Sequence, residues 1–336
     1  MKILVDAFGG DNAPYAPIAG AVQAVAEGIA EVALVGDEEK ICAAAAEKGL
    51  SLDGIGVIPA PDVMEMEDEP RRILKDKKDS SMAVGLRLTA EGQGDAFVSA
   101  GSTGALIMGA TFLTKRIKGV SRPALAPLLP SDNGPFMLLD SGANADCRPE
   151  MLLQFALLGS LYMEHVVCPG ETPTVGLLNI GTEDSKGGEL QKATFPLLRD
   201  SGLCFVGNVE ARDVPYGKAK VIVADGFSGN VLLKTMEGTA SMLLHTVREL
   251  FMTNLRTKLA GLLVKPYLSG LKKRMDTSEY GGAPVLGVAR PVIKAHGNSD
   301  ARAIRSAIRV AAEYAASGAV DRMTEAIARA AAPAEE

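Results

Sequence analysis

The stretch Phe136-Met-Leu-Leu-Asp140-Ser-Gly-Ala-Asn144-Ala-Asp146 joins a short apolar run to a segment of small, amide and carboxylate residues. A helix is expected to open just after it, at Pro149-Glu150. A buried strand, a polar loop and then a helix are typical of the carboxyl edge of a parallel sheet, where open α/β folds bind their ligands. The stretch therefore predicts both the fold class and the place of a site.

The same pattern recurs elsewhere in the chain, each time after a run that is typical of a strand. Because the carboxyl ends of parallel strands meet at one edge of a sheet, we expect all these loops to converge on one site. The other five segments are Asp6-Ala-Phe-Gly-Gly-Asp11, Ser99-Ala-Gly-Ser-Thr-Gly104, Asn179-Ile-Gly-Thr182, Gly207-Asn-Val-Glu210 and Asp225-Gly-Phe-Ser-Gly-Asn230.

Length and composition limit the possible folds, partners and locations of the protein. With 336 residues, of which 47% are hydrophobic, the chain can form one α/β domain over 1–336 or two lobes around a cleft. The net charge of −6 argues against nucleic acid as a partner. The four cysteines lie far apart, which predicts neither a metal site nor disulfides and favours the reducing cytoplasm. Asp6 interrupts the first apolar run, so no secretory signal is expected, and no apolar run reaches the roughly 18 residues of a membrane span.

Strands and helices are predicted to alternate, as in a mostly parallel sheet with helices on both sides. The expected strands are 2–5, 31–35, 54–59, 96–100, 136–139, 174–178, 203–206 and 220–224, and the expected helices are about 15–28, 37–49, 70–91, 103–117, 149–166 and 187–200.

The pattern changes after Gly226. We expect a protruding helical hairpin at about 230–276, in which a long helix ends at Pro266 because proline lacks the N–H that a helix needs. A turn at Tyr280-Gly-Gly-Ala-Pro284 and two short strands should follow. The segment 299–330 is predicted to be one helix, capped by Ser299 or Asn298.

Glycine-rich loops are candidate anion sites, because glycine lets backbone N–H groups approach a ligand. Gly9-Gly10 fits this description, although such a pair is more often a tight turn. In Gly101-Ser-Thr-Gly104 two hydroxyls add further donors, and the alternative is an ordinary helix cap by Ser102 or Thr103. Asp225-Gly-Phe-Ser-Gly-Asn230 allows the same two interpretations.

No nucleophile for covalent acyl transfer is recognisable in the sequence. There is no GxSxG motif, no HxxxxD pair and no cysteine in a recognisable nucleophile setting. Among three histidines, His296 has the most suggestive position, two residues after Lys294 where a strand meets the last helix. For His296 we favour catalysis or anion binding over a structural role, whereas His165 and His245 are expected to be structural.

Taken together, the motifs resemble the acyl-ACP:phosphate acyltransferase (PlsX) family of bacterial phospholipid synthesis over residues 1 to about 315. Asn12 and Ser102 depart from the histidine and asparagine that many members carry, so position 12 supplies no imidazole in this chain. The segments that carry the resemblance are Val5 to Pro14, Phe97 to Ala105, Ile117 to Pro127, Asp140 to Asp146, Gly176 to Glu183, Gly207 to Glu210, Asp225 to Asn230 and Tyr280 to Pro284.

The resemblance implies a reaction in which acyl-ACP and inorganic phosphate give acyl phosphate and free carrier protein, without a cofactor or metal. It also implies a three-layer α/β sandwich similar to the isocitrate and isopropylmalate dehydrogenases, and a homodimer. Phosphate oxygens are already nucleophilic, so attack on a thioester needs only orientation and anion stabilisation. The expected catalytic residues are Lys186, Asn179, Asn230, His296 and Lys294, and the expected phosphate-binding residues are Gly9, Gly10, Asp11, Gly101, Ser102, Thr103, Gly104, Asn144, Asp225 and Gly229.

The partners follow from the same resemblance. Acyl carrier protein is acidic and must meet a local basic surface. The basic residues of 71–78 are interleaved with acids and are more typical of a solvated helix face. A second cluster consists of an apolar tip and the cations that flank it, and this combination suits an anionic membrane surface. The alternative is that the apolar residues form the core of a helix-bundle dimer. The residues of this cluster are Leu259, Leu262, Leu263, Lys265, Lys272, Lys273 and Arg274.

The expected location is therefore the cytoplasm, at the inner face of the cell membrane, where a glycerol-3-phosphate acyltransferase would use the acyl phosphate. Two alternatives stay open. One is an NAD- and metal-dependent dehydrogenase of the related fold, and the other is a non-catalytic membrane scaffold.

Overall fold

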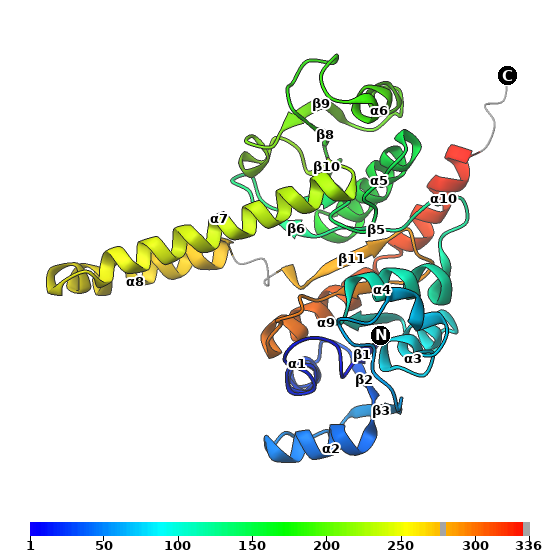
Figure 1. Cartoon of the computed structure of the whole chain (residues 1–336), viewed down its shortest axis with the longest axis vertical. Helices are drawn as coiled ribbons and strands as arrows, with labels where there is room; N and C mark the ends of the chain where they lie inside the picture. Colours follow the sequence, from blue (N-terminus) through cyan, green and yellow to red (C-terminus); the bar gives the residue numbers. More distant parts are fainter. Residues whose placement is uncertain (276–279, 332–336) are drawn as a thin grey trace.

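Two mostly parallel sheets organise the chain (Figure 1). The computed structural model describes residues 1–275 and 280–331, and at 266, 268–275 and 331 it describes the backbone alone. The seven-stranded sheet has the order β3 (Ile55–Pro59), β2 (Glu31–Gly36), β1 (Lys2–Asp6), β4 (Ala96–Ser99), β12 (Val292–Lys294), β11 (Ala283–Leu286) and β5 (Ala124–Leu125). The five-stranded sheet has the order β6 (Leu128–Leu129), β7 (Phe136–Leu139), β10 (Val221–Val223), β8 (Val175–Asn179) and β9 (Phe205–Glu210).

The mostly parallel α/β architecture predicted from the sequence is confirmed. The central strands β4, β7, β10 and β12 are buried along their whole length, as parallel strands covered on both faces should be. The antiparallel strands β5, β6 and β11 lie toward the sheet edges that face each other. Only Ala126 and Pro127 separate β5 from β6, so the chain crosses from one sheet to the other at this point. Sequence analysis missed β5 and β6 because each is only two residues long.

The described helices are α1 (Tyr15–Ala26), α2 (Glu38–Glu47), η1 (Pro70–Leu74), α3 (Ser81–Ala90), α4 (Thr103–Gly109), η2 (Ala110–Lys115), α5 (Pro149–Tyr162), η3 (Met163–Val167), α6 (Glu189–Arg199), η4 (Val214–Tyr216), α7 (Gly226–Met252), α8 (Leu255–Met275), α9 (Ala301–Ala316) and α10 (Ala319–Ala331). They cover the two sheets, apart from the projecting pair α7 and α8.

Several predicted boundaries are wrong for local reasons. The expected helix 70–91 is divided, because Ser80 caps a new helix by accepting from the Ala83 N–H. The C-terminal helix begins with Asp300 as its cap, instead of Ser299 or Asn298, and breaks at Gly318, where φ is 68°. The expected loop at Gly207 lies inside β9.

One apolar core runs through both sheets. It joins Val5 of β1 to Leu139 of β7 and includes helices α1, α5 and α9. The rings of Tyr162 and Tyr314, from α5 and α9, meet edge to face at 4.9 Å between centroids. Helix α10 then packs against α5, so the C-terminal segment ties the two halves of the chain together.

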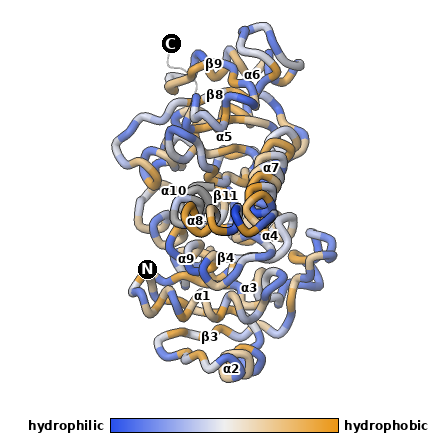
Figure 2. The backbone as a smooth tube through the Cα atoms, turned by 90° about the vertical axis from the view of Figure 1, so that its left-hand side faces the viewer, coloured by the Kyte–Doolittle hydropathy of each residue, from blue (hydrophilic) through white to orange (hydrophobic). Residues whose placement is uncertain are grey.

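A helical hairpin of α7 and α8 projects from the body of the molecule (Figures 1 and 2). The prediction that Pro266 ends the first helix is wrong, because the chain turns at Thr253 and Asn254. The Asn254 Oδ1 accepts from the N–H groups of Arg256 and Thr257 and so starts α8. The backbone of α8 continues through Pro266; a proline removes one helical hydrogen bond, and the remaining bonds carry the helix on.

Close packing between α1 and α9 gives a test of this fold. A Cβ at Gly20 would lie 2.6 Å from the Ile304 Cβ, whereas nothing lies within 4 Å of one at Gly238 on α7. Gly20→Ala should therefore destabilise the protein by about 1–3 kcal/mol through overpacking. Gly238→Ala should instead stabilise it by up to about 1 kcal/mol through helix propensity. Denaturant unfolding measures both, and equal effects would contradict the packing described.

Candidate active site

A buried carboxylate fixes the loops after β1 and β4. Asp6 accepts hydrogen bonds from the hydroxyls of Ser81 at 2.6 Å and Ser99 at 2.7 Å. Burial raises the pKa of Asp6, and these hydrogen bonds counteract part of that rise. Gly9 fits tightly here, because a Cβ at this position would lie 2.7 Å from the backbone nitrogen of Gly101. The glycines of both predicted loops therefore allow the two loops to approach each other closely.

A second buried carboxylate fixes the loop after β7 and links the two sheets. Asp140 accepts from the backbone N–H of Leu125 in β5 at 2.9 Å and from both nitrogens of Asn144. Burial raises the pKa of Asp140, and its hydrogen bonds oppose the rise. Gly229, in the first turn of α7, packs directly on this residue, since a Cβ there would come within 1.9 Å of the Asp140 carbonyl oxygen.

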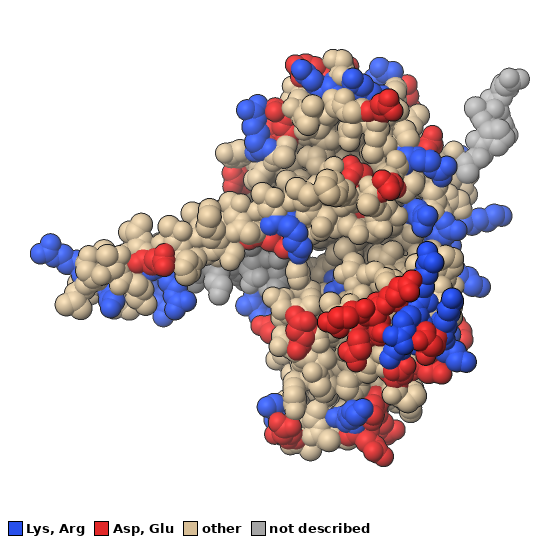
Figure 3. All heavy atoms as spheres, viewed as in Figure 1, with Lys and Arg blue, Asp and Glu red and all other residues tan. Residues whose placement is uncertain are grey.

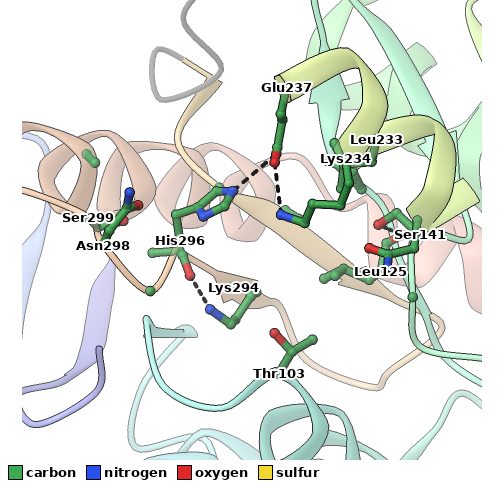
Figure 4. Close-up of a pocket in the computed structure, with 18 of the residues that line it drawn as sticks. Thr103, Leu125, Ser141, Leu233, Lys234, Glu237, Lys294, His296, Asn298 and Ser299 are labelled. Atoms are coloured by element: carbon green, nitrogen blue, oxygen red, sulfur yellow. Dashed lines mark hydrogen bonds and ion pairs between the residues drawn. The ribbon is translucent and has the colours of Figure 1, made fainter. Parts of the chain in front are cut away.

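A cavity of about 730 Å³ lies between the sheets, and we call it the inter-sheet cavity (Figure 4). One wall is apolar, with Leu125, Leu128, Leu129 and Leu233. Polar groups line the rest, from α7 on one side and from the segment after β12 on the other. They include Thr103, Ser141, Asn230, Lys234, Glu237, Lys294, His296, Asn298, Ser299 and Asp300.

Lys294 is the buried cation of this cavity. Its side chain is only 8% exposed, and its ammonium donates to the carbonyl oxygens of Ala100, at 3.2 Å, and Ala295. Burial lowers the pKa of Lys294 to about 8; Asp11 and Asp6 act in the opposite direction, and Lys234 lowers it further. The described hydrogen bonds of this ammonium go to carbonyl oxygens and not to a carboxylate, so it can pair directly with an anion.

His296 and Lys234 meet at a shared carboxylate. Glu237 Oε1 lies 3.2 Å from His296 Nε2, and Glu237 Oε2 lies 2.9 Å from Lys234 Nζ (Figure 4). Burial alone would raise the pKa of Glu237, but the hydrogen bonds from His296 and Lys234 outweigh it, and the pKa is lowered. The site therefore holds an ionised carboxylate between two donors.

The structure brings four of the predicted site residues to the cavity lining, namely Thr103, Asn230, Lys294 and His296. A second group belongs to the loops that support the lining: Asp11 donates its N–H to the Gly297 carbonyl, Asn144 donates to the Pro123 carbonyl, and Asp225 caps α7. The other members of this second group are Gly9, Gly10, Gly101, Ser102, Gly104 and Gly229.

Asn179 and Lys186 are not among the residues that line the cavity. The Asn179 side-chain amide donates to the Lys186 carbonyl at 3.0 Å. The ammonium of Lys186, which is 48% exposed, lies 3.7 Å from Glu183. In this chain these two predicted catalytic residues form a separate polar group at the end of β8.

Sequence analysis missed Lys234, Glu237 and Ser141. A signal for the first two was present, because Asn230, Leu233, Lys234 and Glu237 follow the spacing i, i+3, i+4 and i+7 of one helix face. That face of α7 turns toward the inter-sheet cavity. Among the described residues, no three His, Cys, Asp or Glu side chains form a group that could hold a metal ion.

The hairpin carries the predicted contact residues away from the body. Leu259, Leu262 and Leu263 are all more than 60% exposed, and Lys265 is exposed beside them. Figure 3 shows the hairpin as mostly uncharged, with Lys and Arg near its far end. The side chains of Lys272, Lys273 and Arg274 lie outside the described residues. No helix in the described part of the chain is both long and apolar enough to cross a membrane.

The buried ammonium of Lys294 gives a pH prediction. Its folded pKa of about 8 lies below the ordinary value of 10.5, so between these values the unfolded chain binds more protons. Stability should therefore rise with pH in this window, by on the order of 3 kcal/mol, relative to a Lys294→Met variant. Urea unfolding of both proteins from pH 7.5 to 10.5 measures the difference, and parallel curves would show that Lys294 is not desolvated.

Comparison with known proteins now assigns the chain. The family model described as "Fatty acid synthesis protein" matches residues 1–322. A phosphate acyltransferase of Bacillus licheniformis is 51% identical over 315 residues, which cover 93% of this chain and 94% of that relative.

Two solved structures share the fold. A phosphotransacetylase from Streptococcus pyogenes has a TM-score of 0.65 at 17% identity and covers 94% of both chains. A 4-hydroxythreonine-4-phosphate dehydrogenase from Klebsiella pneumoniae has a TM-score of 0.54 at 12% identity, and the match covers 94% of this chain and 99% of the dehydrogenase chain. This match confirms the predicted likeness to a dehydrogenase fold. The chain therefore belongs to the phosphate acyltransferase (PlsX) family that its motifs resemble, and it is an acyltransferase.

Proposed function

We propose that the protein transfers the acyl group of acyl-ACP to inorganic phosphate, forming acyl phosphate for phospholipid synthesis. The observation that carries the proposal is the inter-sheet cavity, which combines a buried, carbonyl-bound Lys294 with an apolar wall. The cation suits phosphate, and the leucines suit a fatty acyl chain. Thr103 lies near Lys294 and supplies a hydroxyl donor (Figure 4).

In the reaction, a phosphate oxygen attacks the thioester carbonyl carbon, so a C–O bond forms and the C–S bond breaks. The sulfur leaves as a thiolate and takes up a proton, for which His296 is the candidate donor. Lys294 stabilises the negative charge, and Asn230 orients the thioester. A protein nucleophile is not required; burial raises the pKa of Cys147 to about 11, which makes this thiol a poor nucleophile.

Carrier and membrane contacts belong to the same proposal. Within the basic cluster at 71–78, Arg72 is paired to Asp76 at 2.6 Å and Lys77 is paired to Asp62 at 2.7 Å, so these two cations are partly neutralised toward acyl carrier protein. The hairpin, with exposed leucines beside Lys265, is the better candidate for carrier protein, for the inner face of the cell membrane and for a homodimer. From the membrane surface, acyl phosphate would pass to a glycerol-3-phosphate acyltransferase.

Trapping the product tests the proposed reaction. Palmitoyl-ACP and inorganic phosphate are incubated with the protein, and acyl phosphate is captured with hydroxylamine. Hydroxamate above the enzyme-free background should form only when phosphate is present. Equal formation without phosphate would indicate an acyl-enzyme, and no formation would exclude this function.

The hairpin gives a separate prediction. Each leucine buried in the headgroup region is worth up to about 1.5–3 kcal/mol, so Leu259→Glu with Leu263→Glu should release the protein from anionic liposomes. Val206→Glu with Tyr216→Glu adds the same charge on exposed residues of the body and is the matched control. Liposome flotation and size-exclusion chromatography are the measurements. Turnover at saturating acyl-ACP should persist in both variants, because neither pair of residues is among those that line the inter-sheet cavity.

Two results would contradict this assignment of the hairpin. A hairpin variant that stays on liposomes would place the membrane contact elsewhere. A variant that dissociates from a dimer to a monomer would show that these leucines form the dimer core.

A further inference from the structure

The carboxylate of Glu237 lies where a ligand anion would be expected. Each of its two oxygens pairs with a different side chain: Oε2 lies 2.9 Å from Lys234 Nζ, and Oε1 lies 3.2 Å from His296 Nε2. Lys234 and Glu237 come from α7, which follows the five-stranded sheet, whereas His296 follows β12 of the seven-stranded sheet. The three side chains thus form a bridge across the inter-sheet cavity (Figure 4).

The surroundings of this bridge favour an anion. The charge of Lys234 helps to lower the pKa of Lys294, and both side chains line the cavity. Asp11 and Asp6 partly balance Lys294, and Asp300 is a further acid of the lining. Without Glu237, two lysines and an imidazole would face one cavity. A carboxylate that neutralises these groups must lower the attraction for any incoming anion.

Release of Glu237 requires little rearrangement. Its side chain is 24% exposed on the surface of α7, and the Lys234 and His296 side chains are each more than half exposed. Rotation of the Glu237 side chain into solvent would free both donors without movement of the helix. The hydrogen bonds lost to the carboxylate can be replaced by bonds to the oxygens of a tetrahedral anion.

We propose that Glu237 occupies the place of an anionic substrate, and that Lys234 with Lys294 forms a two-lysine phosphate subsite that Glu237 vacates on binding. This inference rests on the proposed function for the identity of the anion as inorganic phosphate. It adds Lys234 as a substrate-binding residue and gives Glu237 a role opposed to binding.

The two residues should affect phosphate affinity in opposite directions. Lys234→Gln removes a charge-assisted hydrogen bond and should weaken phosphate binding roughly tenfold. Glu237→Gln keeps the shape of the side chain but removes the competing charge, and it should tighten binding roughly threefold. Isothermal titration of the full-length protein with inorganic phosphate measures both effects without any acyl donor.

Matched controls are available on α10, where Arg322 and Glu325 form an ion pair with the same i, i+3 spacing. Neither residue is among those that line the inter-sheet cavity. Arg322→Gln and Glu325→Gln should change the phosphate affinity less than roughly twofold. Thermal melting of each variant checks that it is folded. Glu237→Ala is a second variant with the same expected direction as Glu237→Gln.

Unchanged or weaker phosphate binding in both Glu237 variants would overturn the inference, as would unchanged affinity in Lys234→Gln or no phosphate binding by the wild type. Failure of the proposed function is distinguishable. If the protein binds phosphate with these opposite effects but makes no acyl phosphate, the proposed subsite is supported and the proposed reaction is wrong. If the protein makes acyl phosphate but the variants do not show these effects, the proposed reaction is supported and only the proposed subsite is wrong.

Discussion

The hydrogen bonds of the Asp140 carboxylate are the constraint on which the site depends. This carboxylate ends β7 of the five-stranded sheet and accepts from Leu125 N–H of the seven-stranded sheet. It also holds Asn144, which in turn donates to the Pro123 carbonyl. Because an unpaired buried donor or acceptor is costly, these bonds fix how the two sheets meet. The inter-sheet cavity exists where they meet.

The chemistry of the cavity follows from this junction. The apolar wall comes largely from the short β5–β6 segment that Asp140 holds in place, and the polar wall comes from α7 and from the segment after β12. A ligand in the cavity would therefore contact both halves of the chain. Lys294, buried among carbonyls, gives this space a positive charge that the overall charge of −6 does not suggest.

Much of the fold could be predicted from the sequence, because buried parallel strands leave long apolar runs and their polar ends mark one sheet edge. The same reasoning found Thr103, Lys294 and His296, which lie at the end of a strand or within a few residues after it. It did not find Lys234 and Glu237, since these lie on a helix whose orientation depends on Gly229 packing against Asp140. Helical spacing alone showed that they share a face and not which way the face points.

Other differences from the sequence-based expectations have separate causes. The sequence predicts a helix end at Pro266, yet the side chain of Asn254 decides where the chain turns. Asn179 ends β8 and Lys186 lies in the loop that follows it, but β8 lies beyond β10 from the edge at which the two sheets meet. Strand order in a sheet depends on long-range pairing, which periodicity in one sequence cannot give.

A crystal structure of the protein grown with inorganic phosphate would test the central claim most directly, that the inter-sheet cavity is the phosphate site. The account predicts a tetrahedral anion within about 3 Å of Lys294 Nζ, with Lys234 turned toward it and away from Glu237. An anion bound instead between Asn179 and Lys186, with the Lys234–Glu237–His296 bridge intact, would contradict it.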